Sequence, residues 1–121
     1  MSGLLIDTDV FIDYLMGSEQ AADFLEYARD DLHLSAITLA ELADTVTGDA
    51  EWQALDSALT ALRVHAVDEE VARAAAGLRG RTFAHRLIAA TARTHGLKLV
   101  TRDRKAYPDI VDVLVPYRPL L

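Results

Sequence analysis

The sequence predicts an α/β domain in which a central parallel sheet of four to five short strands is covered by helices on both faces. Short apolar runs alternate along the chain with longer segments whose apolar residues recur at helical spacing. This alternation is typical of strands joined by crossover helices, which make the strands parallel. A length of 121 residues suits one hydrophobic core, so we expect a single domain over residues 1–121.

Each predicted strand is a short run rich in apolar residues between polar or turn-forming ones. In chain order, the runs are 4–6, 32–35, 63–67, 97–100 and 110–115. Pro116 should end the last run, because proline has no N–H to donate to a sheet ladder. His33 and His65 fall at strand positions, so we expect structural roles for both.

The helices are predicted from apolar periodicity and from residues that favour helix ends. They cover about 8–16, 19–29, 37–46, 51–62, 69–79 and 83–95. Ser18 and Asp68 are typical N-caps, and either Asp7 or Thr8 can cap the first helix. Gly96 suits the end of the last helix, where His95 also favours a C-terminus.

Composition narrows the class of protein. Hydrophobic residues make up 51% and charged residues 26%, as in an ordinary globular domain. No apolar run approaches the roughly 20 residues of a membrane span, and no basic-then-apolar segment opens the chain as a signal peptide would. The absence of cysteine excludes a disulfide framework, a zinc–thiolate site and a cysteine nucleophile. We therefore expect a cytoplasmic protein that does not associate with membranes.

Charge is distributed unevenly along the chain. The whole sequence carries a formal charge of −7, which by itself argues against a nonspecific nucleic-acid binder. Residues 79–105, however, hold eight bases and one acid, a net of +7, so the remainder, with four bases and eighteen acids, carries −14. Two interpretations stay open: a basic face for an anionic partner, or arginines solvated on helix surfaces.

Three acidic residues fall where ligands gather in parallel sheets, beyond the carboxyl ends of the strands. Asp7 follows the first predicted strand, Asp103 follows the fourth, and Glu41 lies on the helix after the second. Taken singly, Asp7 suits a helix N-cap, Glu41 a solvent-facing stripe and Asp103 a turn. Because all three belong to the same edge of one sheet, we expect them to converge.

Converging carboxylates require a proton or a cation, since two of them about 4 Å apart repel by roughly 4 kcal/mol at an effective dielectric of 20. Oxygen ligands favour a hard ion, Mg²⁺ or Mn²⁺. Such an ion lowers the pKa of a bound water and polarises a phosphate oxygen. The acids thus predict metal-assisted phosphodiester hydrolysis, with Asp7, Glu41 and Asp103 as catalytic and metal-binding residues. The candidate RNA contacts in the basic segment are Arg86, Arg93 and Arg102.

Four segments resemble PIN-domain ribonucleases of the VapC toxin type, and the resemblance extends over nearly the whole chain. In chain order they are LLIDTDVFIDYL, SAITLAEL, VHAVDEEVARAAAGLR and LIAATARTHGLKLVTRD. Asp7, Glu41 and Asp103 stand at acidic positions of the family pattern. The resemblance implies a PIN-like fold and a metal-dependent endoribonuclease that is the toxin of a toxin–antitoxin pair. It also implies an RNA substrate, an antitoxin partner and a homodimer.

One acidic position of the family pattern is replaced in this chain. Members usually carry an aspartate two residues before the LIAATA segment, where this sequence has His85, and the stretch 78–87 is shorter than usual. His85 would either ligate a metal through its neutral imidazole, which suits Zn²⁺ or Mn²⁺, or leave a weakened site with slow or absent hydrolysis. We expect the second, because an imidazole removes a negative charge. Asp9 and Asp13, placed on the polar face of the first helix, are the acids available to compensate.

Two alternatives come from other classes of protein. In the first, the domain keeps the PIN scaffold but binds a peptide or RNA without cutting it, as the missing acid suggests. In the second, the DTDV segment resembles the opening motif of haloacid-dehalogenase phosphatases, with Asp7 as nucleophile and Asp9 as general acid. That enzyme would need a lysine partner and a longer chain, and Lys98 precedes its strand instead of following it.

Overall fold

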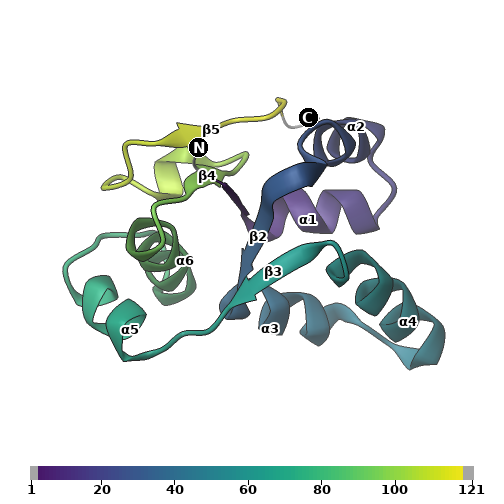
Figure 1. Cartoon of the computed structure of the whole chain (residues 1–121), viewed down its shortest axis with the longest axis horizontal. Coiled ribbons are helices and arrows are strands. Elements are labelled where there is room, and N and C mark those ends of the chain that lie inside the picture. Colours follow the sequence, from purple (N-terminus) through teal and green to yellow (C-terminus); the bar gives the residue numbers. More distant parts are fainter. Residues whose placement is uncertain (1–2, 119–121) are drawn as a thin grey trace.

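In the computed structural model, which describes residues 3–118, five strands form one sheet in the order β3-β2-β1-β4-β5 (Figure 1). The strands are β1 (Leu4–Ile6), β2 (Leu32–Ser35), β3 (Leu62–His65), β4 (Lys98–Val100) and β5 (Val113–Leu114). All four pairs of neighbouring strands are parallel. The described residues thus confirm the predicted α/β domain with a parallel sheet.

Within residues 3–118, six α-helices connect and cover these strands. They are α1 (Thr8–Leu15), α2 (Glu19–Tyr27), α3 (Ala36–Thr45), α4 (Gly48–Leu59), α5 (Glu69–Ala76) and α6 (Phe83–Thr94). Two short 3₁₀ turns, η1 (Arg29–Asp31) and η2 (Arg104–Ala106), were not predicted. Asp7, Ser18 and Asp68 each cap a helix through their side chains, as expected.

A few boundaries differ from the prediction for local reasons. Helix α4 begins at Gly48 rather than Glu51, and the Glu51 carboxylate accepts from the backbone N–H and the hydroxyl of Thr47, both at 3.0 Å. Glu51 is therefore a capping residue within the first turn and not the start of the helix. Helix α5 ends at Ala76, where the N–H of Gly77 bonds back to carbonyl oxygens of the last turn.

The core lies on both faces of the sheet. Because side chains alternate along a strand, Leu5 and Leu99 face α5 and α6, while Ile6 and Val100 face the cluster that includes residues of α1, α2 and α4. Figure 1 shows α5 and α6 on one side of the strands and α1 and α4 on the other. In the part of the chain that is described, no helix has both the length and the apolar character of a membrane span.

Backbone pairing brings the functional ends of the strands together. The N–H of Asp7, just past β1, donates to the carbonyl oxygen of Val100 at the end of β4 over 2.8 Å. Helix α6 runs toward the start of β4, so its first turn lies at the edge of the sheet where β1 and β4 end. This edge carries the site described next.

Candidate active site

A cavity of about 330 Å³ opens at the carboxyl edge of the sheet. Its lining residues come from the ends of β1 and β4 and from α1, α3 and α6: Asp7, Thr8, Asp9, Ile12, Glu41, His85, Arg102 and Asp103. The three acids singled out in the sequence line this one cavity together with His85. The fold therefore gathers carboxylates from positions up to 96 residues apart, counted from Asp7 to Asp103.

Asp7 is both a helix cap and a wall of the cavity. Its side chain is almost fully buried, with 3% of the residue exposed. One carboxylate oxygen accepts from the N–H of Thr8 at 2.7 Å, and the other accepts from the Thr101 hydroxyl at 2.7 Å. Burial raises the pKa of Asp7 above its usual value, and these two donors oppose part of that rise. The buried charge is tolerated because both of its oxygens are hydrogen-bonded.

Asp9 belongs to the site, although the sequence placed it on the polar face of a helix. Its Oδ2 accepts from the N–H of Arg102 at 3.1 Å and lies 3.3 Å from the hydroxyl oxygen of Thr101. Its Oδ1 is buried and has no hydrogen-bond partner among the described residues. Burial, together with the neighbouring charge of Asp7, raises the pKa of Asp9 to about 6. Two acids are therefore packed around a single threonine.

Glu41 is oriented by a hydroxyl from another helix. The Thr8 hydroxyl donates to Glu41 Oε1 at 2.6 Å and lies 3.0 Å from the hydroxyl of Thr38. Since a hydroxyl has one hydrogen, Thr8 can donate to Glu41 only if Thr38 is the donor in the second contact. This chain of hydroxyls fixes the exposed Glu41 side chain of α3 against the start of α1.

Asp103 is occupied by an arginine that sequence analysis did not assign to the site. Arg81 forms an ion pair with it, using both terminal nitrogens of the guanidinium, and the longer contact joins Nη2 to Oδ1 at 3.3 Å. Arg81 lies in the segment between α5 and α6, 22 residues before its partner. The sequence did not indicate that Arg81 would pair with Asp103, because the pairing depends on how the segment between α5 and α6 folds.

His85 is held in the first turn of α6 by the N-cap residue Thr82. The Thr82 hydroxyl oxygen accepts from the His85 backbone N–H at 3.2 Å and lies 2.8 Å from Nδ1 of the imidazole. The hydroxyl can either donate to Nδ1 or accept from an Nδ1–H, so this contact is compatible with both tautomers of the ring. The ring stands edge-on to Tyr107, with centroids 5.2 Å apart. Tyr107 is buried, and its hydroxyl has no hydrogen-bond partner among the described residues.

Of the three predicted RNA contacts, only Arg102 lines the cavity, where its Nε also pairs with Asp13 at 2.7 Å. Arg86 instead donates to the carbonyl oxygen of Ala75, in the last turn of α5, and to that of Leu78, just after this helix. Arg93 donates to the carbonyl oxygen of Asp109, near the other end of α6. The structure thus gives Arg86 and Arg93 contacts within the fold, away from the acids.

Half of the bases in the basic segment, residues 79–105, are paired with carboxylates of the same chain. Four of its eight bases form ion pairs with carboxylates: Arg79 with Asp109, Arg81 with Asp103, Lys98 with Asp112, and Arg102 with Asp13. The count of +7 for this stretch therefore overstates the free positive charge on its surface. A sequence count misses this effect because the partner acids lie mostly outside the segment.

The donor set suits a hard divalent ion, because it consists of carboxylate oxygens with one imidazole and no sulfur. Asp9 Oδ1 is buried and has no hydrogen-bond partner among the described residues, so it is a further oxygen that a bound cation would satisfy. Within the described residues, however, no three acidic or histidine side chains are arranged so that they could hold one ion. Asp103 faces Arg81 and Glu41 is held by Thr8, so the donor chemistry fits a metal while the side chains are engaged elsewhere.

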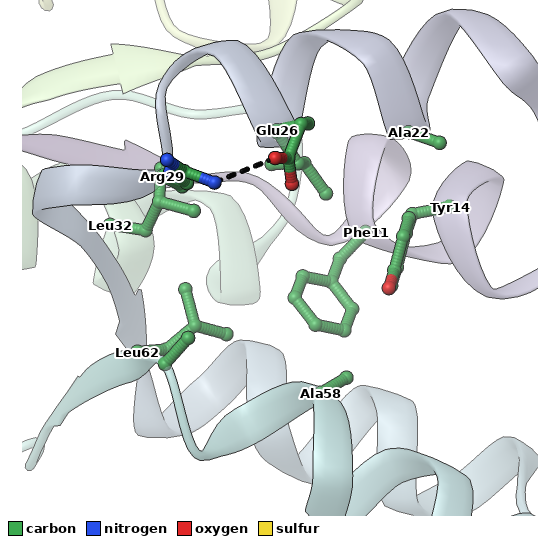
Figure 2. Close-up of a pocket in the computed structure, with 10 residues that line it drawn as sticks. Phe11, Tyr14, Ala22, Glu26, Arg29, Leu32, Ala58 and Leu62 are labelled. Carbon is green, nitrogen blue, oxygen red and sulfur yellow. Dashed lines mark hydrogen bonds and ion pairs between the residues drawn. The ribbon is translucent and has the colours of Figure 1, made fainter.

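A second surface feature is apolar and lies between α1 and α4. A pocket of about 160 Å³ is lined by residues that include Phe11, Tyr14 and Ala58 (Figure 2). A hollow that contains Leu15 and Ala54 joins it to a further pocket of about 410 Å³. The hollow shares Tyr14 and Ala58 with the first pocket and Leu15 and Ala54 with the second, so the three adjoin one another along α1 and α4. We call them the α1–α4 furrow.

Solved structures of other proteins share this fold over nearly the full chain. A toxin–antitoxin complex from Klebsiella pneumoniae contains a chain with a TM-score of 0.87 and 28% identity, covering 97% of this chain and 100% of that one. FitAcB from Neisseria gonorrhoeae gives a TM-score of 0.77 and 29% identity, covering 93% and 97%. VapBC-5 from Mycobacterium tuberculosis gives 0.65 and 25%, covering 93% and 95%.

These neighbours support the resemblance to VapC-type toxins that the sequence motifs suggested. None of the curated proteins matches the chain. The family model of the PIN domain matches residues 4–110, which include all four acids of the cavity. The chain therefore belongs to the PIN domain family.

Proposed function

We propose that this protein is a divalent-metal-dependent endoribonuclease that acts in the cytoplasm as the toxin of a toxin–antitoxin pair. The observation that carries the proposal is the cavity at the carboxyl edge of a PIN domain, which Asp7, Glu41 and Asp103 line together. Carboxylates gathered without a sulfur ligand suit Mg²⁺ or Mn²⁺. The single domain over residues 1–121 is part of the same proposal.

Asp7, Glu41 and Asp103 would hold the ion, which supplies a water of lowered pKa and polarises the scissile phosphate. Burial of Asp7 keeps bulk water from its carboxylate. The Thr8 hydroxyl orients Glu41, and the Thr101 hydroxyl orients Asp7. Arg102, on the rim of the cavity, supplies a positive charge for the RNA backbone. We retain Arg86 and Arg93 only as weaker candidates for that contact.

We further propose that hydrolysis is slow, because His85 stands where the family pattern has an acid. An imidazole carries one negative charge fewer than a carboxylate and so stabilises a divalent ion less. Its Nδ1 is also engaged by Thr82, leaving only Nε2 to face a ligand. His85→Asp should therefore raise activity, and an unchanged rate would contradict this explanation.

The deciding experiment is a cleavage assay on structured RNA with Mg²⁺ or Mn²⁺. The purified chain is compared with the same protein in excess chelator and with Asp7→Asn, which keeps the capping oxygen but removes the charge. Cleavage that disappears in both controls supports the proposal. Including His85→Asp guards against a rate too slow to detect: if neither the natural chain nor this variant cleaves RNA, the nuclease function is wrong.

A non-catalytic binding module is the second candidate, and the Arg81–Asp103 pair favours it together with His85. In that case RNA binding would persist with no metal-dependent cleavage in any variant. The phosphatase alternative is not supported, because the chain belongs to the PIN family. Lys98 moreover pairs with Asp112 at the opposite end of its strand, where it cannot serve Asp7.

We also propose that an antitoxin segment occupies the α1–α4 furrow, since the furrow is apolar and the solved neighbours come from toxin–antitoxin complexes. The product of the adjacent gene is the partner to test by co-expression. Ala54→Arg, on an exposed part of the furrow, should weaken co-purification, whereas Ala72→Arg, exposed on α5, should not. The proposed homodimer would have twice the 13.3 kDa mass of one chain in light scattering.

A further inference from the structure

One acid of the cavity, Asp103, forms an ion pair with Arg81 of the same chain. Both terminal nitrogens of Arg81 contact the carboxylate of Asp103, the two-point geometry that guanidinium groups form with carboxylates. The other acids are held differently, Asp7 by Thr101 and Glu41 by Thr8. Asp103 is therefore the site acid whose charge is neutralised by an arginine.

The backbone of Arg81 is anchored while its side chain is free to move. Its N–H donates to the carbonyl oxygen of Ala106 at 3.1 Å, which ties the segment before α6 to the turn after Asp103. The preceding Gly80 is closely packed, since a Cβ there would lie 3.0 Å from the backbone nitrogen of Arg86. The Arg81 side chain is nevertheless 52% exposed, so it can leave Asp103 without moving the main chain.

The ion pair between Arg81 and Asp103 is weak enough for a metal ion to replace the arginine. The Asp103 side chain is 36% exposed, and ion pairs so open to water contribute little to stability. A divalent ion would bring twice the charge of a guanidinium and would bind the carboxylate oxygen directly. Competition for Asp103 therefore favours the metal once it is present at sufficient concentration.

We propose that Arg81 is an exchangeable counter-ion of the site. It neutralises Asp103 in the metal-free protein, and it releases that carboxylate to a divalent ion. The freed guanidinium, still tethered beside the cavity, then contacts a phosphate of the bound RNA. This inference rests on the proposed function, and it makes Arg81 a positioning residue for both metal and substrate.

Metal binding by the full chain tests the first half of the exchange. Mn²⁺ affinity is measured by isothermal titration calorimetry for the natural protein, for Arg81→Gln and for Arg79→Gln. Arg79 is a matched control because it lies on the same segment and pairs with Asp109, outside the cavity. Arg81→Gln should bind Mn²⁺ several-fold more tightly, and Arg79→Gln should match the natural protein. Equal or weaker binding by Arg81→Gln would overturn the proposal.

RNA binding tests the second half. A short single-stranded RNA with phosphorothioate linkages, which resist hydrolysis, is titrated at several salt concentrations with Mn²⁺ or with chelator. Losing one phosphate contact lowers the slope of log affinity against log salt by about 0.7 for a single strand. Arg81→Gln should show that loss only when Mn²⁺ is present. The same loss in chelator, or none in Mn²⁺, contradicts the release of Arg81.

The two proposals fail in different ways. If the natural protein binds no Mn²⁺, or if Asp7→Asn binds it equally well, the metal site and this exchange are both wrong. If the natural protein binds Mn²⁺ through Asp7 and cleaves RNA while Arg81→Gln leaves Mn²⁺ affinity unchanged, only the exchange is wrong. In that case Arg81 is a structural partner of Asp103 and nothing more.

Discussion

The Thr101 hydroxyl donates to the carboxylate of Asp7 across 2.7 Å and thereby joins residues 94 positions apart in the sequence. The same oxygen accepts from the backbone N–H of Asp103 at 3.0 Å. One fully buried threonine thus links the ends of β1 and β4 and sets two acids of the cavity relative to each other. It has no charge and would not be recognised as a functional residue from its type alone.

Replacing this threonine by valine should destabilise the protein at neutral pH. Thr101→Val keeps the shape but leaves a buried carboxylate without one of its donors, at a cost of about 1–3 kcal/mol. The loss is measured by urea unfolding at pH 8, with Thr60→Val, at an exposed threonine, as control. Because the penalty falls on charged Asp7, the deficit should shrink as the pH is lowered; an equal deficit in acid would contradict this explanation.

Asp9 should make the protein less stable as the pH rises. Its pKa is raised from 3.8 to about 6 in the folded state, so between those values the folded protein binds more protons than the unfolded chain. Stability is therefore lost as the pH rises through this window. Asp9→Asn removes the effect and should gain about 2 kcal/mol above pH 7, with little gain near pH 4.

Urea unfolding of both proteins at pH 4, 6 and 8 measures this difference. Asp44→Asn, an exposed acid of α3, serves as the control and should change stability by less than about 0.5 kcal/mol at each pH. If Asp9→Asn is no more stable than the natural protein at pH 8, the buried carboxylate is not a source of instability. RNA cleavage by the same variant reports separately whether Asp9 contributes to the site.

A histidine stack at the other end of the sheet should have the opposite pH dependence. His33 Nδ1 lies 2.8 Å from His65 Nε2, and the rings of His65 and His95 stack 4.1 Å apart. Burial, and then the proximity of His95, His33 and Arg63, lowers the pKa of His65. The unfolded chain therefore binds more protons here, and stability is lost as the pH falls below about 6.5.

His65→Gln should reduce this loss on acidification. Unfolding free energies at pH 8 and pH 5.5 are compared with and without the substitution in an Asp9→Asn background, so that Asp9 does not contribute to the difference. The variant with glutamine should lose less stability between the two values. An identical loss in both proteins would show that His65 titrates as it does in the unfolded chain.

Gly3 should not tolerate a side chain. A Cβ at this position would clash with the His33 imidazole and lie 2.7 Å from Oδ2 of Asp31, whose other oxygen, Oδ1, contacts His33 Nε2. Gly3→Ala should therefore destabilise the protein by about 1–3 kcal/mol, the usual cost of overpacking. Gly77→Ala is the control, because its φ of −94° is open to any residue and its nearest neighbour is 3.8 Å away.

Thermal and urea unfolding compare these two variants. Gly77→Ala should be neutral or gain about 0.4–1 kcal/mol, since alanine restricts the unfolded chain more than glycine does. The histidine signals of Gly3→Ala in nuclear magnetic resonance should also shift, because the Asp31–His33 contact must open to admit the methyl group. A Gly3→Ala protein as stable as the natural one would contradict the close approach.

Local features were predicted well from the sequence. The strands 4–6 and 32–35 were predicted with the bounds that the structure has, and Ser18 and Asp68 cap helices as expected. These features depend on residues within one or two turns of each other, so the local pattern contains the needed information. The acids of the cavity could be proposed for a related reason: parallel strands bring their carboxyl ends to one edge.

The assignment of individual charges could not be predicted in the same way. The bonds from Arg86 to carbonyl oxygens of the chain were not indicated by the sequence, and Asp9, which was placed on a polar helix face, is packed against Thr101. Each of these outcomes depends on contacts between side chains that lie far apart in the sequence. A local sequence pattern does not encode such contacts. Ion pairs such as Arg81–Asp103 form only after the segments have been placed.

The sequence by itself determined the strand and helix order, the caps and the edge of the sheet where the acids lie, because periodicity and capping act over a few residues. The tertiary structure alone decided which acids are buried, which hydroxyl binds each carboxylate and which arginine neutralises Asp103. Desolvation and ion pairing depend on the full set of neighbours in space, and that set exists only in the folded chain.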